Sequence, residues 1–314
     1  PLSAEEGDFS LAYIITIHKE LAMFVQLLRA IYVPQNVYCI HVDEKAPMKY
    51  KTAVQTLVNC FENVFISSKT EKVAYAGFTR LQADINCMKV LVHSKFQWNY
   101  VINLCGQDFP IKTNREIIHY IRSKWSDKNI TPGVIQPLHI KSKTSQSHLE
   151  FVPKGSIYAP PNNRFKDKPP HNLTIYFGSA YYVLTRKFVE FILTDIHAKD
   201  MLQWSKDIRS PEQHYWVTLN RLKGATPNAG WEGNVRAIKP LRRRHLRIRT
   251  RRPAVAHSVA FSVCQQIRTL DRPACGYLLR AAAQTSSAEA GRSSYRATLA
   301  FSTAESFQYE TEPL

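Results

Sequence analysis

Short apolar runs alternate with helix-like segments over the first 123 residues, and this alternation restricts the fold more than any other feature of the chain. Each run ends at polar or turn-forming residues, which is typical of buried strands: Leu11–Ile17, Asn36–Val42, Val64–Ser67 and Tyr100–Leu104. Apolar residues recur at helical spacing in the segments that follow: Lys19–Ile31, Tyr50–Cys60, Thr79–Ser94 and Asn114–Ser123. This pattern predicts a three-layer α/β fold, a Rossmann-type and mainly parallel sheet flanked by helices.

The sequence after residue 123 is less regular. Residues 124–170 are polar and rich in Pro and Lys, so we expect a long loop region that shapes a binding site. Strand character returns over Leu173–Leu184, and helices are expected over Lys187–His197 and Pro211–Arg221. Ser210 is the predicted N-cap of the last helix.

The composition changes sharply after Lys239. The chain has a formal net charge of +17, and beyond Lys239 it holds twelve Arg and no Lys. Seven of these Arg lie within Leu241–Arg252. No aromatic residue interleaves this run, so we interpret it as solvated coil and predict no nucleic-acid partner. We expect a polar lead-in at residues 1–10, one domain over 11–239 and a disordered tail over 240–314.

Several motifs that would indicate other functions are missing from the sequence. Neither a Gly-x-Gly-x-x-Gly nor a Walker loop occurs, which disfavours dinucleotide and P-loop sites. No run of about 18 apolar residues occurs, so no membrane span is expected inside the chain. No Asp-x-Asp pair occurs, and a divalent ion held through a diphosphate usually needs carboxylates, so we predict no metal. Two sequons, at Asn129 and Asn172, are compatible with a secretory route and glycosylation.

Polar residues follow the predicted strands where ligands bind in open α/β sheets. His18 and Asp43 come directly after the first two strands, and Asp108 lies in the turn after Tyr100–Leu104. These residues suit hydrogen bonds to a base or a ribose, although for either residue alone the pattern favours a satisfied loop histidine or a capping aspartate. Tyr75 precedes a predicted helix and is either a stacking partner for a base or a core residue.

Glu212 stands in the first turn of the helix expected over Pro211–Arg221. An acidic residue there faces the positive end of the helix, so capping explains it fully. The functional alternative is a carboxylate that points into the cleft and acts as a general base.

Four motifs occur in order and, together, resemble one family: Tyr38–Asp43, Ala83–Cys87, Cys105–Pro110 and Gly178–Tyr181. Over residues 10–239 the chain is similar to the core-2/I-branching β-1,6-N-acetylglucosaminyltransferases of the glycosyltransferase family 14 type. The resemblance implies a GT-A-like fold and transfer of N-acetylglucosamine (GlcNAc) from UDP-GlcNAc. The acceptor would be the 6-hydroxyl of a galactose or GalNAc in an O-glycan or poly-lactosamine, on a glycoprotein or glycolipid. The reaction would proceed with inversion and without a metal or other cofactor.

The resemblance also assigns roles to individual residues. His18, Asp43 and Tyr75 match donor-binding positions, and Asp108 lies in the Cys105–Pro110 motif beside them. Cys39 and Cys87 match a disulfide in similar proteins. The resemblance further implies a type II membrane anchor upstream of Pro1 and a lumenal domain in the Golgi.

Two departures from the family pattern bear on catalysis. The family's general base is the Glu of Ser-Pro-Asp-Glu, but here Ser210-Pro211-Glu212-Gln213 places Gln213 at that position. An amide does not accept a proton at neutral pH, and Glu212 lies about 100° away round an α-helix. The basic segment that holds the leaving diphosphate in similar proteins is not recognisable after Lys239. The alternative function is therefore an impaired paralogue that binds a nucleotide sugar or a glycan.

Overall fold

The computed structural model describes residues 4–151, 156–158 and 165–222. Its strands are β1 (Leu11–Ile17), β2 (Val37–Val42), β3 (Val64–Ile66), β4 (Tyr100–Cys105), β5 (Gly133–Ile135), β6 (Leu149–Phe151), β7 (Ser156–Tyr158), β8 (Tyr176–Gly178) and β9 (Val183–Thr185). Its α-helices are α1 (Ala4–Gly7), α2 (Leu21–Ile31), α3 (Met48–Val58), α4 (Phe78–His93), α5 (Asn114–Trp125), α6 (Ser142–Ser145), α7 (Arg186–Thr194), α8 (Ile196–Trp204) and α9 (Tyr215–Leu219). Short 3₁₀ helices are η1 (Leu138–Ile140), η3 (Pro170–Asn172), η4 (Ser205–Asp207) and η5 (Pro211–Gln213).

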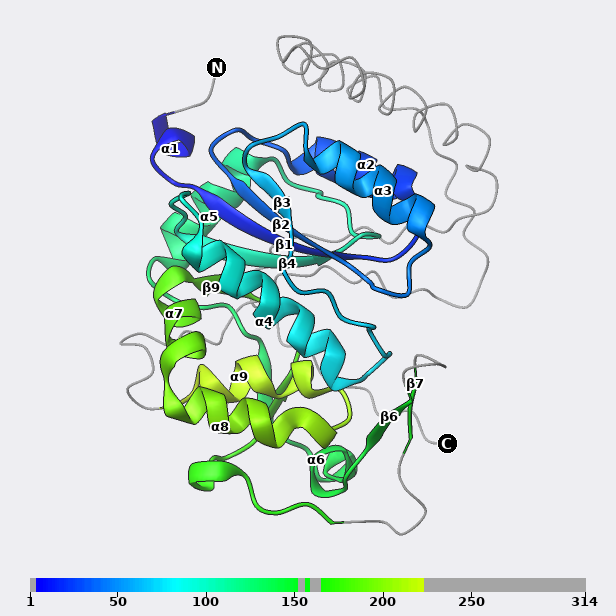
Figure 1. Cartoon of the computed structure of the whole chain (residues 1–314). Helices are drawn as coiled ribbons and strands as arrows, with labels where there is room; N and C mark the ends of the chain where they lie inside the picture. The colour runs from blue at the N-terminus through cyan, green and yellow to red at the C-terminus, as the bar shows by residue number, and fades with distance from the viewer. Residues whose placement is uncertain (1–3, 152–155, 159–164, 223–314) are drawn as a thin grey trace, which may run out of the picture.

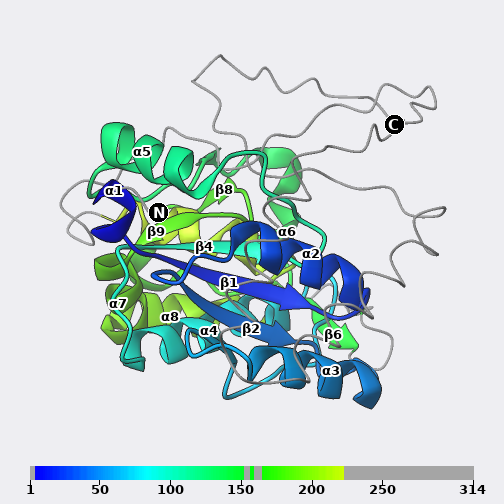
Figure 2. The same ribbon diagram turned by 90° about the horizontal axis from the view of Figure 1, so that it is seen from above.

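The main sheet has five strands in the order β3-β2-β1-β4-β9 (Figure 1). The first four are parallel, and β9 pairs with β4 in the antiparallel direction. Figure 2 shows β4, β1 and β2 side by side. The α/β class and the mainly parallel sheet predicted from the sequence are confirmed.

Helices cover both faces of this sheet, so its strands are buried on each side (Figure 1). The side chains alternate along β1: Tyr13 packs with α2, α3 and α5, whereas Ile14 packs with α4, α7, α8 and α9. Both residues are at most 1% exposed. Burial on two faces explains why each parallel strand is a continuous apolar run in the sequence.

Three sequence expectations about the later elements were wrong in detail. The strand expected over 173–184 is two short strands, β8 and β9, that belong to different sheets. The helix expected over 187–197 ends at Thr194, because Asp195 accepts a hydrogen bond from the His197 backbone and caps α8. The helix expected over 211–221 is a 3₁₀ turn followed by α9, and Ser210 has a positive φ of 53° without a side-chain cap.

The region expected as a loop over 124–170 contains short elements. Strand β5 pairs with β8, and β6 pairs with β7, each in the antiparallel direction. Helix α6 and strands β6 and β7 lie below the main sheet in Figure 1. The predicted tail over 240–314 falls outside the described residues. Among the residues that the structure does describe, no helix is long and apolar enough to span a membrane.

Candidate functional site

The register of the main sheet brings His18 and Asp43 together at its carboxyl edge. Ile17 of β1 pairs with Val42 of β2, so the two residues that follow these strands are neighbours. The Asp43 backbone N–H donates to the Ile17 carbonyl over 2.8 Å, and the Asp43 carboxylate accepts from the Lys45 backbone over 2.8 Å. Asp43 is buried, whereas His18 is exposed. The strand order reverses between β1 and β4, so His18 lies beside the usual ligand position in open α/β sheets and Asp43 lies one strand away from it.

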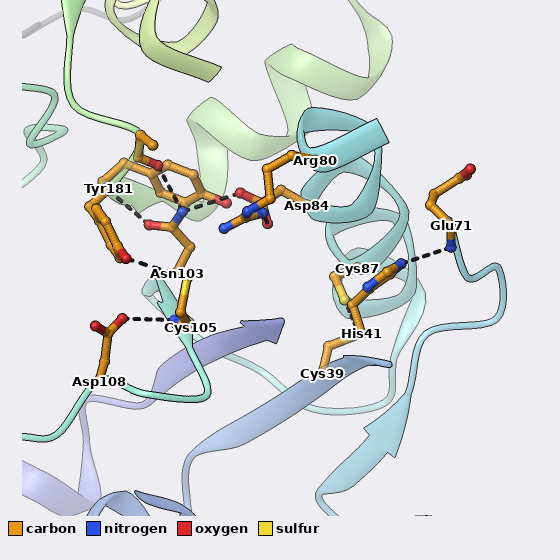
Figure 3. Close-up of polar contacts among 12 residues, drawn as sticks. Cys39, His41, Glu71, Arg80, Asp84, Cys87, Asn103, Cys105, Asp108 and Tyr181 are labelled. Atoms are coloured by element: carbon orange, nitrogen blue, oxygen red, sulfur yellow. Dashed lines mark hydrogen bonds and ion pairs between the residues drawn. The ribbon is translucent and has the colours of Figure 1, made fainter. Parts of the chain in front are cut away.

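The turn after β4 is closed by Asp108 (Figure 3). Its carboxylate accepts from the Cys105 backbone over 2.7 Å, and its own N–H returns to the Cys105 carbonyl over 2.9 Å. At Gly106 a Cβ atom would lie 2.8 Å from a methyl carbon of Ile17, so the turn approaches β1 closely. Asp108 is 5% exposed and has a structural role in this turn; its donor-binding role stays a prediction.

His41, in the Tyr38–Asp43 motif, also has a structural role. Its Nε2 accepts a hydrogen bond from the Glu71 backbone over 2.9 Å, and the residue is fully buried (Figure 3). Burial lowers the pKa of His41, so the imidazole is neutral and accepts this bond. The contact fixes the segment that leads towards Tyr75. Tyr75 itself is 83% exposed, so the alternative of a core tyrosine was wrong.

A buried polar network links α4 to β4 and to the Gly178–Tyr181 motif (Figure 3). Arg80 forms an ion pair of 2.5 Å with Asp84, whose other oxygen accepts from the Asn103 amide over 3.2 Å. The same amide donates to the Ala180 carbonyl over 2.9 Å. Sequence reasoning missed this network. Its one signal was an amide, Asn103, inside an otherwise apolar strand.

Glu212 lies close to this network in an unusual electrostatic setting. The residue is 8% exposed, and its Oε2 is buried without a hydrogen-bond partner. Burial raises the pKa of Glu212 to about 7, with Asp84 adding to the rise and Arg80 and Lys143 opposing it. The carboxyl is therefore divided between its neutral and charged forms at neutral pH, which suits a general base.

Gln213 points to a different partner. Because Pro211–Gln213 is a 3₁₀ turn, successive side chains diverge by about 120°. The Gln213 Oε1 accepts a hydrogen bond from the Lys143 ammonium over 3.2 Å. Lys143 also lies over the ring of Phe177, 4.9 Å from its centroid. The amide at the family's base position is thus held by a cation rather than left free.

The predicted disulfide pair lies where α4 packs against β2. Cys39 of β2 and Cys87 of α4 are fully buried, and their sulfur atoms are 2.8 Å apart (Figure 3). Both thiols are free in the structure, so the bond itself stays a prediction.

The two sequons occupy opposite environments. Asn129 is fully buried: its Oδ1 accepts from the Thr185 backbone over 2.8 Å, and its amide donates to Asn220 over 2.9 Å. The expectation of a glycan on Asn129 is therefore corrected, because the folded chain leaves no room for one there. Asn172 is exposed, so it is still expected to carry a glycan.

Within the described residues, no group of three or more His, Cys, Asp or Glu side chains has the arrangement needed to hold a metal ion. The groups that gather near the site are instead a carboxyl, Glu212, and two cations, Arg80 and Lys143. Such an arrangement can accept a proton and offset negative charge.

Comparison with known proteins defines the class to which this fold and site belong. The sequence profile described as Core-2/I-Branching enzyme matches residues 11–262, which runs past the domain boundary expected at Lys239. The chain is 99% identical over 242 residues to the human "Probable beta-1,3-galactosyl-O-glycosyl-glycoprotein beta-1,6-N-acetylglucosaminyltransferase 7", covering 76% of this chain and 56% of that protein. The chain belongs to the Core-2/I-branching enzyme family.

More distant relatives carry related names. The chain is 53% identical over 243 residues to the mouse "N-acetyllactosaminide beta-1,6-N-acetylglucosaminyl-transferase", covering 76% of this chain and 60% of that protein. It is 42% identical over 231 residues to the human "Beta-1,3-galactosyl-O-glycosyl-glycoprotein beta-1,6-N-acetylglucosaminyltransferase 3", covering 73% and 52%. The chain thus spans little more than half the length of the curated relatives it matches.

Proposed function

We propose that this protein transfers GlcNAc from UDP-GlcNAc to the 6-hydroxyl of a galactose or GalNAc and thereby forms a β-1,6 branch. Family membership and the names of the relatives support the reaction class. The observation that carries the proposal for this chain is Glu212, a buried carboxyl with an unpaired oxygen and a pKa of about 7. It supplies the basic group that the Gln213 amide does not.

The reaction would be a single displacement with inversion. The acceptor oxygen attacks the anomeric carbon of GlcNAc while its proton passes to the Glu212 carboxylate. The bond between the anomeric carbon and the β-phosphate oxygen breaks, and UDP leaves with the electron pair. His18 and Asp43, adjacent at the sheet edge, are the proposed contacts to the donor, with Tyr75 available to stack on the base.

The decisive experiment is a transfer assay with UDP-GlcNAc on mucin-type and poly-lactosamine acceptors. It compares the wild type with Glu212→Gln, and Glu62→Gln, an exposed glutamate on the surface, serves as the control. A 1,6-linked product that depends on Glu212 supports the proposal. Absence of product from every acceptor would refute it.

Metal independence is a separate part of the proposal. The sequence has no Asp-x-Asp pair, and cations near Glu212 can offset the charge of the leaving diphosphate without a metal ion. Calorimetry of UDP binding in EDTA should give the same Kd as calorimetry in Mn²⁺. Binding that appears only with Mn²⁺ or Mg²⁺ would disprove this part.

A second candidate function is a binding protein that no longer turns over. The observation that favours it is the Lys143–Gln213 hydrogen bond, because an amide fixed at the base position accepts no proton. UDP or glycan binding without transfer in the same assays would select this function.

A Golgi lumenal location, with an anchor outside the chain, is also proposed, and imaging of the tagged full-length protein tests it.

A further inference from the structure

A cluster of nitrogen-bearing side chains lies beside Glu212 and Gln213, and two of its three members take no part in the proposed reaction. Its members are Lys143 of α6, His148 before β6, and Arg209 before η5. The Arg209 backbone N–H donates to the Lys143 carbonyl over 3.2 Å, and the His148 N–H donates to the Asp207 carbonyl over 2.8 Å. These two bonds fix segments distant in sequence side by side.

Within the described residues neither Lys143 nor Arg209 forms an ion pair, and Glu212 acts on Lys143 from beyond ion-pair distance. The nearby Asp207 carboxylate is already occupied, since it pairs with Lys166 and accepts from the Ser147 hydroxyl over 2.7 Å. The two cations are close enough that Arg209, together with burial, lowers the pKa of Lys143. Two like charges held together favour an anion between them, and Glu212 is the acid that partly offsets Lys143.

His148 gives an independent indication of a ligand. The residue is 8% exposed, and its Nδ1 is buried with no hydrogen bond of normal geometry, while the Gln146 and Asp207 backbones interact with the ring and raise its pKa against the effect of burial. A buried nitrogen without a partner costs free energy in the folded chain, and a bound polar group would satisfy it. Arg209 lies near enough to His148 to influence its pKa, so the unpartnered nitrogen belongs to the same cluster.

We infer that Lys143, His148 and Arg209 form a subsite for an anionic substituent, a sulfate or a sialic acid carboxylate, on the acceptor glycan. This inference rests on the proposed transferase function and specifies its substrate. The cluster lies within and against residues 124–170, the region that we expected to shape a binding site. The Phe177 ring beside Lys143 provides an apolar surface of the kind that packs against the C–H face of a sugar.

The test compares a neutral poly-lactosamine acceptor with two acidic versions, one sulfated and one sialylated next to the accepting galactose. The wild type should use at least one acidic acceptor with a kcat/KM about tenfold higher, the size of one charge-assisted hydrogen bond. Arg209→Gln and Lys143→Gln should each remove that preference. Lys206→Gln is the matched control, because it removes an exposed positive charge from the same surface.

Two outcomes would overturn the inference. One is equal use of neutral and acidic acceptors by the wild type, or a preference that survives Arg209→Gln. The other is a loss of UDP affinity in Arg209→Gln, which would assign the cluster to the donor diphosphate. Calorimetry with the acidic acceptor in the presence of UDP separates the two proposals: selective binding without transfer refutes the proposed function and retains the subsite.

Discussion

The ammonium of Lys143 lies 3.2 Å from the Oε1 of Gln213 and donates a hydrogen bond to it. A carboxylate at residue 213 would form an ion pair with the same ammonium, which would favour its charged form. The surroundings of residue 213 are therefore suited to a negative charge that this chain does not carry. The acid of the site lies one residue earlier, at Glu212, where Arg80 lowers its pKa more than Lys143 does.

Gln213→Glu should raise transfer activity. A carboxylate there would be ionised at neutral pH beside Lys143 and would add a second basic group next to Glu212, so the gain should be smaller than the roughly 10²–10⁴-fold effect of a sole general base. The measurement is kcat for transfer from UDP-GlcNAc by wild type and variant, side by side. Gln213→Asn keeps the amide and serves as the control. An unchanged kcat in Gln213→Glu, combined with activity that requires Glu212, would contradict this prediction and would leave Glu212 as the only base, with residue 213 taking no part in proton transfer.

The main sheet was predictable because its strands are buried on both faces. Each parallel strand therefore appears as an uninterrupted apolar run, and Leu11–Ile17 was predicted with the bounds that the structure has. The later elements were harder to predict. Strands β8 and β9 are three residues each, and a single apolar stretch does not reveal that the chain changes sheets between them.

The candidate site was only partly predictable for a related reason. His18 and Asp43 follow strand ends, and parallel pairing makes such residues neighbours whatever the rest of the chain does. Arg80 and Asp84 have the spacing of an ordinary exposed ion pair on a helix. Asp84 is nevertheless buried and accepts a hydrogen bond from Asn103 of β4, a contact that the helical spacing does not reveal. The raised pKa of Glu212 arises from the same tertiary packing.

Cys39 and Cys87 should form a disulfide when the protein is made in an oxidising compartment. Their sulfur atoms are already 2.8 Å apart, so little rearrangement is needed. Closing a loop with a sequence separation of 48 residues is worth about 4 kcal/mol in the chain-entropy model. Peptide mapping of secreted protein without reductant should recover the linked pair, with Cys105 alkylated as a free thiol. Alkylation of all three cysteines would contradict the prediction.

Asn172, and not Asn129, should carry a glycan in secreted protein. Asn172→Gln or Thr174→Ala should remove a mobility shift produced by peptide-N-glycosidase. Asn129→Ala should leave that shift unchanged but lower the free energy of unfolding by about 1–3 kcal/mol, because the buried Thr185 N–H loses its partner. A glycan found on Asn129 would show that this region folds differently from the structure.

Glu212→Gln should have opposite effects on activity and on stability. Without the base, kcat/KM should fall by roughly 10²–10⁴-fold, and its rise with pH through about 7 should disappear. The folded-state pKa of Glu212 lies above its unfolded value of 4.5. Its contribution to stability is therefore fully present below about pH 4.5 and is lost as the pH rises through about 7.

The glutamine amide in Glu212→Gln has the shape of the neutral acid and does not ionise. The variant therefore avoids the free-energy cost of a buried charge. At pH 8 the variant should exceed the wild type in free energy of unfolding by up to about 3 kcal/mol, and near pH 4.5 the two should be nearly equal. Urea denaturation at both pH values measures this difference, with Glu62→Gln as the exposed control. A variant that is less stable than the wild type at pH 8 would mean that Glu212 is held as a stabilising carboxylate. It would then not be a base kept near neutrality by burial.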